Sequence, residues 1–165
     1  MKRIKTDYPI YNFHEGVFDK TSFTLTEQED ISNSINSLFQ EGPASFHEAS
    51  GQLYFTRSAD ELDKKKTVQL NLYQIQLSDL NQNKTPTALP INVNEFSTMH
   101  PSVNAAGTEL YFASDRPGGF GGMDLYRVNI EAGVFSDPIN LGADINTVGD
   151  EVFPFAYSDQ FMFYS

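Results

Sequence analysis

The sequence predicts an all-β protein built from repeated antiparallel sheets, and two observations predict it. Short apolar runs rich in Tyr, Phe, Val and Ile alternate with Gly, Pro, Asn and Asp along most of the chain, a pattern typical of strands joined by turns. Similar strings also recur at a period of about fifty residues, which indicates a modular architecture.

The clearest repeated string is an apolar strand that follows a turn. Leu53-Tyr54-Phe55 recurs 57 residues later as Leu110-Tyr111-Phe112, and a third copy begins 51 residues after that, at Phe161. In the middle copy, Leu110 and Phe112 point to one face and Tyr111 and Ala113 to the other. Because both faces are apolar, we expect this strand to lie inside a sheet that is packed between two neighbouring sheets.

Two more signals repeat behind this strand. Leu72-Tyr73-Gln74-Ile75 becomes Leu125-Tyr126-Arg127-Val128, a shift of 53 residues. Three spaced residues then recur with a shift of 52: Pro86, Leu89 and Asn94 correspond to Pro138, Leu141 and Asn146. Four-stranded units of about 40 to 50 residues build β-propellers. The predicted fold is therefore an incomplete β-propeller of about three blades of four-stranded antiparallel sheet.

The repeats divide the chain into two parts. Residues 35–165 form the propeller repeats, with blades at about 42–94 and 95–147 and a partial blade at 148–165. Residues 1–34 form an N-terminal segment, which is an extra strand, a linker or the end of a preceding blade. Since propellers need about four to eight blades to close a ring, we expect a piece of a longer propeller, or sheets completed by pairing with other chains.

The segment between these parts allows two interpretations. A helix from about 27 to 39 is favoured by the capping-box spacing of Thr26 and Glu29 and by four apolar residues at helical spacing: Ile31, Ile35, Leu38 and Phe39. The later copy of the segment, 144–149, is typical of a loop over a blade edge. The repeat therefore favours a loop, with at most one helical turn.

Charge and composition exclude several partners. The 165 residues hold 11 Lys and Arg against 22 Asp and Glu, a net charge of −11. Such a surface repels phosphate backbones, so we expect no nucleic-acid partner. The absence of cysteine excludes disulfides, thiolate zinc sites and a cysteine nucleophile.

The N-terminus does not predict a secretion signal. Met1 to Lys5 is basic, but Asp7 and Pro9 interrupt the apolar run that a signal peptide requires. No stretch approaches the roughly 20 apolar residues of a membrane-spanning helix. We therefore expect no direct insertion into a membrane.

Several strings in the second repeat resemble a known family. They are His100-Pro101-Ser102-Val103, the stretch from Gly107 to Tyr126, Pro138 to Gly142, and Ile145-Asn146-Thr147. They resemble the WD40-like β-propeller repeat of TolB-like proteins, in the variety found in bacterial envelope proteins that often end in an OmpA-like domain. Glu41 to Phe46 and Leu53 to Arg57 match the preceding blade.

The resemblance implies a non-catalytic scaffold or protein-interaction module, located in the periplasm or at the outer membrane. It implies no cofactor. The chain departs from the family in lacking the OmpA-like domain, and residues 59–66 replace the Gly-rich turn in the first repeat. The alternative is an accessory propeller of a hydrolase, a peptidase or a glycosidase, whose catalytic residues lie outside this chain; no G-x-S-x-G string occurs here.

The candidate binding site is the Gly-rich turn at 115–124. Its glycines leave backbone amides free to face a ligand. The two carboxylates, nine residues apart, have the chemistry to hold a cation, but the alternating ligands of an EF-hand loop are missing, so no metal site is predicted. The alternative is a hairpin turn whose carboxylates accept backbone N–H bonds. The candidate residues are Asp115, Arg116, Gly118, Gly119, Phe120, Gly121, Gly122 and Asp124.

Other chemistry-bearing residues favour structural roles. The histidines, His14, His47 and His100, have no metal-ligand spacing. Glu151 recurs as Glu41, so we expect a blade-edge carboxylate that accepts backbone hydrogen bonds. The basic run at 64–66 serves solubility. Two loop aromatics, Phe120 and Phe135, are candidates to anchor a partner.

Two kinds of protein association are expected. Residues 85–165 hold ten acidic and two basic side chains, a net charge of −8, so a protein partner should dock there through a basic patch. The last strand has no strand to follow it, and its open edge favours self-association.

Overall fold

The structure is a computed structural model that describes residues 11–31, 34–37, 39–62, 67–82, 84–158 and 160–165. The N-terminal basic stretch and the basic run at 64–66 lie outside the described residues. The fold is all-β with antiparallel sheets, which confirms the predicted fold class. Within the described residues, no helix is long and apolar enough to cross a bilayer.

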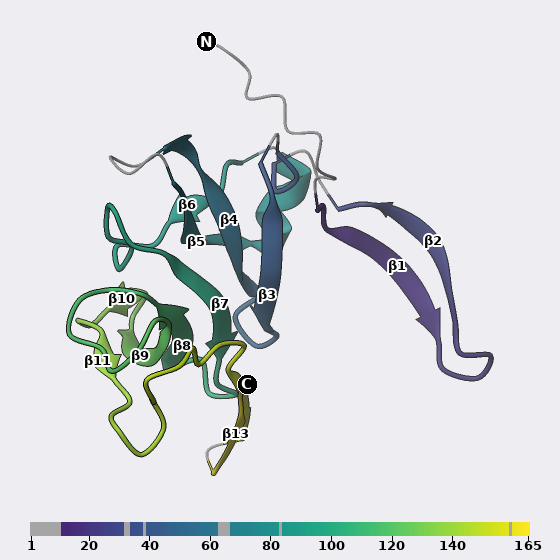
Figure 1. The fold of residues 1–165 in the computed structure, drawn as a ribbon. Coiled ribbons are helices and arrows are strands. Elements are labelled where there is room, and N and C mark those ends of the chain that lie inside the picture. The colour runs from purple at the N-terminus through teal and green to yellow at the C-terminus, as the bar shows by residue number, and fades with distance from the viewer. Residues whose placement is uncertain (1–10, 32–33, 38, 63–66, 83, 159) are drawn as a thin grey trace.

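Two complete blades form the body of the molecule (Figure 1). In the first blade the strands follow chain order: β3 (Glu41–His47), β4 (Gln52–Leu62), β5 (Val68–Gln76) and β6 (Thr87–Ala88), with a 3-10 helix, η1 (Leu77–Gln82), after β5. The second blade contains β7 (Thr98–Val103), β8 (Glu109–Ser114) and β9 (Asp124–Glu131). Two short strands, β10 (Val134–Phe135) and β11 (Ile139–Asn140), both pair with β9 as its outer neighbours.

Two-stranded sheets flank these blades. The N-terminal half-blade consists of β1 (His14–Asp19) and β2 (Thr24–Asp30), and it projects as a hairpin from the body (Figure 1). The C-terminal half-blade consists of β12 (Phe155–Ser158) and β13 (Phe161–Phe163).

Neither interpretation of the segment 27–39, the helix or the preferred loop, describes its start. Residues 24–30 form strand β2, in register with β1 from His14 opposite Asp30 to Asp19 opposite Thr24. The capping-box spacing is a local signal, and cross-strand pairing with β1 overrides it. The loop interpretation applies after Ile31, where residues 34 and 35 form a turn.

Apolar faces of successive sheets pack against each other. The first and second blades share a core of buried side chains that includes Tyr54, Leu72, Leu110 and Phe112. The opposite face of β8 is also buried, because Ala113 packs in a separate cluster that reaches Met162 of the C-terminal half-blade. The middle strand of this blade is therefore covered on both faces, as expected from its sequence.

An asparagine joins each blade to the segment that follows it. The side-chain amides of Asn92 and Asn146 each accept from the N–H and donate to the C=O of one residue in the third strand. These residues are Leu72 (2.9 and 2.9 Å) and Leu125 (2.8 and 3.0 Å). The equivalent of Asn146 is therefore Asn92, and the predicted correspondence with Asn94 is wrong by two residues.

The same asparagine contact identifies the N-terminal half-blade. Asn36 binds the backbone N–H and C=O of Phe13, both at 2.8 Å. The N–H of Ile31 donates to the same carbonyl at 3.2 Å, as that of Leu141 does to Leu125 at 3.0 Å. Phe13 thus occupies the third-strand position of its blade. It follows that β1 and β2 are the third and fourth strands of a blade that precedes the first blade.

The C-terminal half-blade is the opposite half of a blade. Ala156 pairs with Met162 in the same way that Val103 pairs with Leu110 in the second blade. Hence β12 and β13 are first and second strands, and the equivalent of Leu110 is Met162 rather than Phe161. The described residues therefore contain the second half of one blade, two whole blades and the first half of another.

Candidate functional site

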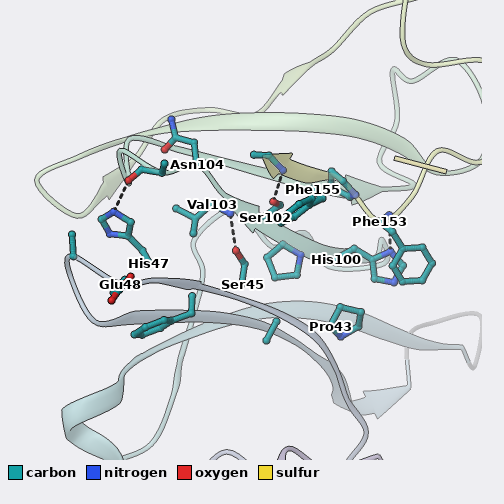
Figure 2. Close-up of a pocket in the computed structure, with 17 residues that line it drawn as sticks. Pro43, Ser45, His47, Glu48, His100, Ser102, Val103, Asn104, Phe153 and Phe155 are labelled. Carbon is teal, nitrogen blue, oxygen red and sulfur yellow. Dashed lines mark hydrogen bonds between the residues drawn. The ribbon is translucent and has the colours of Figure 1, made fainter. Parts of the chain in front are cut away.

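A groove lies where the first strands of successive blades meet. Strands β3 and β7 and the start of β12 line it, together with the turn after β3, and its volume is about 710 Å³ (Figure 2). This is within the range of ligand-binding clefts, roughly 300 to 1,000 Å³. Because it is built from the first strands of successive blades, we call it the axial groove.

Serine hydroxyls fix the spacing of the strands that form this groove. The Oγ of Ser45 accepts a hydrogen bond from the N–H of Val103 at 3.0 Å, and the Oγ of Ser102 accepts one from the N–H of Ala156 at 2.9 Å (Figure 2). The two serines are equivalent, 57 residues apart, as Leu53 and Leu110 are. Each blade therefore holds the first strand of the next through the same side chain.

An aromatic stack forms one end of the groove. The rings of His100 and Phe153 lie 3.8 Å apart at 13° (Figure 2). Both residues have left-handed backbone, with φ of 56° and 53°, and the Nδ1 of His100 accepts from the N–H of Phe153 at 3.4 Å. Burial lowers the pKa of His100 to about 4. The imidazole is therefore neutral at pH 7.

The second imidazole of the groove lies at its rim. The Nδ1 of His47 is 2.7 Å from the hydroxyl of Ser50, and its Nε2 is 3.2 Å from the carbonyl of Ala105. A Cβ on Gly107 would lie 2.4 Å from this ring, so the first and second blades meet closely here. His47 thus bridges two blades.

Neither groove histidine forms a hydrogen bond to a carboxylate among the described contacts. The observed histidine–carboxylate contact is elsewhere, between His14 Nδ1 and Asp30 Oδ1 at 3.1 Å on the N-terminal half-blade. Both of those side chains are more than half exposed. The groove therefore offers aromatic, apolar and hydrogen-bonding surface.

The carboxylates of the predicted Gly-rich site are engaged within the protein. Asp124 is 1% exposed and accepts from the N–H of Phe120 at 2.7 Å, the N–H of Gly121 at 3.0 Å and the amide of Asn140 at 2.7 Å. Asp115 accepts from the N–H of Ser97 at 2.6 Å. These contacts are those of the hairpin-turn alternative. Among the described residues, no three His, Asp or Glu side chains gather as metal ligands would.

Arg116 points into the protein rather than along the turn. Its guanidinium donates to the carbonyl of Ile91 at 3.0 Å and to the hydroxyls of Ser114 and Thr98 at 3.0 and 3.1 Å. Burial lowers the pKa of Arg116, which the charge interactions with Tyr126 and Asp115 partly oppose. This side chain therefore stabilises the second blade.

Close packing explains most of the glycines of this turn. A Cβ on Gly121 would lie 2.2 Å from the carbonyl oxygen of Gly149, and one on Gly122 would lie 2.2 Å from Asp150 Oδ1. A Cβ on Gly119 would lie 2.5 Å from Asp124 Oδ2. A Cβ on Gly118, whose φ is 95°, would face open space. The turn is thus packed onto the loop before β12, and its binding role stays a prediction.

The remaining predicted side chains have different environments. Glu151 accepts from the N–H of Thr147 at 2.9 Å, as expected for a blade-edge carboxylate. Glu41 is buried and instead accepts from the hydroxyl of Ser37 and from Arg57. Phe120 is 49% exposed. Phe135 is not a surface anchor, because its ring packs edge-to-face on Tyr54 in the core between blades.

No local motif in the sequence marks the axial groove. Its lining comes from three strands more than fifty residues apart, which no local motif connects. One signal was available: Ser45 and Ser102 recur with the same shift as the neighbouring strand. A polar residue that repeats inside an apolar strand indicates a contact between repeats.

Comparisons with known proteins find similarity among solved structures. No family model matches the chain, and no curated protein matches it. Among solved structures, TolB from Acinetobacter baumannii is similar, with 16% sequence identity and a TM-score of 0.43. The match covers 83% of this chain and 27% of the TolB chain, so this chain spans about a quarter of the length of that protein.

Proposed function

We propose that this protein is a non-catalytic β-propeller module of the bacterial cell envelope, located in the periplasm or at the outer membrane. In this proposal the axial groove binds a protein partner. The observation that carries the binding role is the apolar and aromatic lining of the groove. The location rests on the resemblance of the repeat strings.

The lining of the groove suits apolar side chains of a polypeptide. Phe46, Phe153 and Phe155 line it and are 44%, 53% and 56% exposed. Aromatic residues that stay exposed in a groove are typical anchors of protein interfaces. Three prolines also line the groove, in β3, in β7 and directly before β12, and Pro43 is the exposed one of the three: Pro43, Pro101 and Pro154.

The histidines of the groove support binding rather than acid–base catalysis. A general base is most effective when its pKa lies near the working pH, and the pKa of His100 is far below neutrality. Its Nδ1 is also occupied by the N–H of Phe153. The ring nitrogens of His47 lie within hydrogen-bonding distance of the Ser50 hydroxyl and the Ala105 carbonyl, so in this proposal both imidazoles serve as hydrogen-bonding and stacking surfaces.

Charge adds a second element to the proposal. The net charge of residues 85–165 is −8, and exposed carboxylates in this part include Glu131, Asp137 and Asp144. A partner with a basic surface would be steered toward this side, and rising salt would slow its association. An on-rate that does not change with ionic strength would count against this part.

Photo-crosslinking tests the proposal. A benzoylphenylalanine replaces Phe46 in the groove, Phe120 at the Gly-rich turn or Phe23 at the tip of the N-terminal half-blade, three exposed phenylalanines. The chains are exported to the periplasm of a Gram-negative host and irradiated. We expect a protein adduct from position 46 and none from position 23, while an adduct from position 120 would support the Gly-rich turn as a second binding surface.

The purified adduct partner then provides the quantitative test. Its affinity should fall about tenfold or more for Phe46→Ala, since central aromatic anchors contribute more than about 1 kcal/mol. The matched change Phe23→Ala should leave the affinity unchanged. Adducts that form only outside the groove, or a partner that the protein cleaves, would contradict the proposal.

A further inference from the structure

The Gly-rich turn after β8 and the loop before β12 form one continuous surface. The N–H of Gly122 donates to the carbonyl of Gly149 at 2.9 Å. A Cβ on Gly121 would lie 2.2 Å from the same carbonyl oxygen, so the two backbones touch. We call residues 117–122 and 147–150 the glycine platform, because five of these ten residues are glycine. The platform and the axial groove share no lining residue.

Buried carboxylates hold both parts of the platform in place. Asp124 is 1% exposed and accepts from the N–H groups of Phe120 and Gly121. Glu151 is 6% exposed and accepts from the N–H and the hydroxyl of Thr147. The backbone of the platform is therefore fixed before any partner binds. A surface that is ordered in advance avoids part of the entropy cost of association.

Two apolar side chains lie exposed on this fixed backbone. Phe120 is 49% exposed and Val148 is 93% exposed. They are neighbours, since a Cβ on Gly121 would lie 2.8 Å from the carbonyl carbon of Val148. The position equivalent to Val148 in the preceding connection is Asn94, which is exposed although the blades on both sides of it are complete. The chain therefore has a valine at a position that faces solvent, and clustered exposed apolar side chains mark interaction sites.

The charge around the platform is negative. Asp144 and Asp150 are exposed, and residues 128–165 contain no Lys or Arg. Arg116 is turned away into the second blade, where it donates to the carbonyl of Ile91 at 3.0 Å. The platform therefore fits an apolar side chain that has basic residues on either side of it.

We propose that the glycine platform is a docking surface for a partner protein that presents an apolar side chain flanked by lysine or arginine. The apolar side chain packs on Phe120 and Val148, and the flanking cations face Asp144 and Asp150. A second copy of this chain is the alternative occupant, but its net charge of −11 opposes association with an acidic surface. The inference does not depend on the proposed function, which concerns the axial groove.

NMR titration with synthetic peptides tests the chemistry of the partner. Three probes of equal length are compared: acetyl-Lys-Leu-Lys-Leu-Lys amide, an analogue with serine in place of leucine, and an analogue with glutamate in place of lysine. We expect the backbone amide signals of Phe120, Gly121 and Gly149 to shift with the first peptide at millimolar concentration and not with the other two. Rising salt should weaken this binding, because it screens the attraction between charges.

Matched substitutions locate the contact. Val148→Thr keeps the shape of the side chain, and together with Phe120→Ser it should weaken the binding of the first peptide about tenfold, because both apolar contacts are lost. The control is Val134→Thr, a 69% exposed valine on β10 outside the platform, which should leave the affinity unchanged. Asp150→Asn keeps the oxygen that accepts from the N–H of Met123 but removes the charge. It should weaken binding about twofold and reduce its dependence on salt.

Several outcomes would overturn the inference. Equal affinity for the leucine and serine peptides would show attraction by charge alone. Amide shifts that occur only outside the platform, no shift with any peptide, or an unchanged affinity in the double variant would show that the apolar pair is not the contact. A dimer in sedimentation that dissociates in the double variant would show that the occupant is a second copy of this chain.

The crosslinking experiment separates this inference from the proposed function. An adduct from position 120 without one from position 46 would support the platform and contradict the groove. An adduct from position 46 without one from position 120 would support the groove and count against the platform.

Discussion

The guanidinium groups of Arg57 and Arg116 occupy equivalent positions in the two complete blades. Each lies over one phenylalanine and one tyrosine ring, at 5.2 and 5.0 Å from Phe55 and Tyr73 and at 5.1 and 5.1 Å from Phe112 and Tyr126. Each also donates to the carbonyl of the isoleucine before the joining asparagine, Ile35 or Ile91. The same cation site therefore recurs in successive blades.

The two arginines are not equivalent in sequence. They are 59 residues apart, whereas Phe55 and Phe112 are 57 apart. Arg57 reaches the site from within β4, and Arg116 reaches it from the segment after β8. A long side chain reaches the same point from two backbone positions, so the ring pair and the isoleucine carbonyl define the site.

Removing this cation should destabilise the second blade. Arg116→Met loses two cation–π contacts and leaves the carbonyl of Ile91 without its donor. We expect a loss of about 2 to 3 kcal/mol in the free energy of unfolding, measured by urea denaturation. Arg127→Met is the control, because Arg127 forms an ion pair with Glu109 whose side chains are 32% and 31% exposed, and this variant should lose about 0.5 kcal/mol. Equal losses in both variants would argue against the buried cation site.

The asparagine that joins the blades provides a test of which residue, Asn92 or Asn94, corresponds to Asn146. Asn92→Leu removes both hydrogen bonds to Leu72. It leaves the part-buried N–H of Leu72 unsatisfied, while the C=O keeps the N–H of Leu89 as its donor, so it should cost about 1 to 3 kcal/mol. Asn94→Leu, two residues away at an exposed position, should change stability by less than about 0.5 kcal/mol. Thermal unfolding of the two variants compares them directly. A larger loss of stability in Asn94→Leu than in Asn92→Leu would show that Asn92 is not the equivalent of Asn146.

The Gly-rich turn should tolerate substitution unevenly. A Cβ at position 121 would overlap the carbonyl oxygens of Gly149 and Thr147, so Gly121→Ala should cost about 2 to 4 kcal/mol. At Gly118 nothing lies within 4 Å and only the left-handed backbone opposes alanine, for about 1 kcal/mol. Denaturant titration of both variants tests this. Similar, small losses would mean that the turn does not pack on the loop before β12.

Acid should weaken the protein through His100. Burial lowers the pKa of His100 from 6.5 to about 4 in the folded state. As pH falls through this window, the unfolded chain takes up the proton first, so stability falls with pH. His100→Asn tolerates the left-handed backbone and does not titrate. The stability of the native protein relative to this variant should therefore decrease between pH 6.5 and 4, and a constant difference would contradict the assignment.

The sequence predicts the strand positions in the two complete blades. There, a central strand such as β4 or β8 has both of its neighbouring strands within the same blade. Leu53-Tyr54-Phe55 and Leu110-Tyr111-Phe112 lie in β4 and β8 as predicted. The segment near residue 27 shows the opposite case. Its local pattern favours a helix, but its partner β1 is available and the hairpin forms instead. The helical pattern of this segment misleads because β2 forms by pairing with β1, and the sequence of β1 contains no recognisable copy of the repeat.

The groove and the fate of the predicted site residues required the structure. Nothing in the string 115–124 distinguishes a carboxylate that faces solvent from one that closes its own turn, and Asp124 does the latter. The stack of His100 on Phe153 joins residues that are 53 apart and lie on different blades. Neither contact has a local signature.

By itself, the sequence determined the all-β class, the repeat and the approximate positions of the blades, because these depend on alternation and turn chemistry that each segment carries within itself. The tertiary structure alone decided that β1 and β2 are the second half of one blade, that β12 and β13 are the first half of another, and that arginines at unmatched positions share one kind of site. These features depend on hydrogen-bond register between strands, where a shift of one residue moves every side chain to the other face.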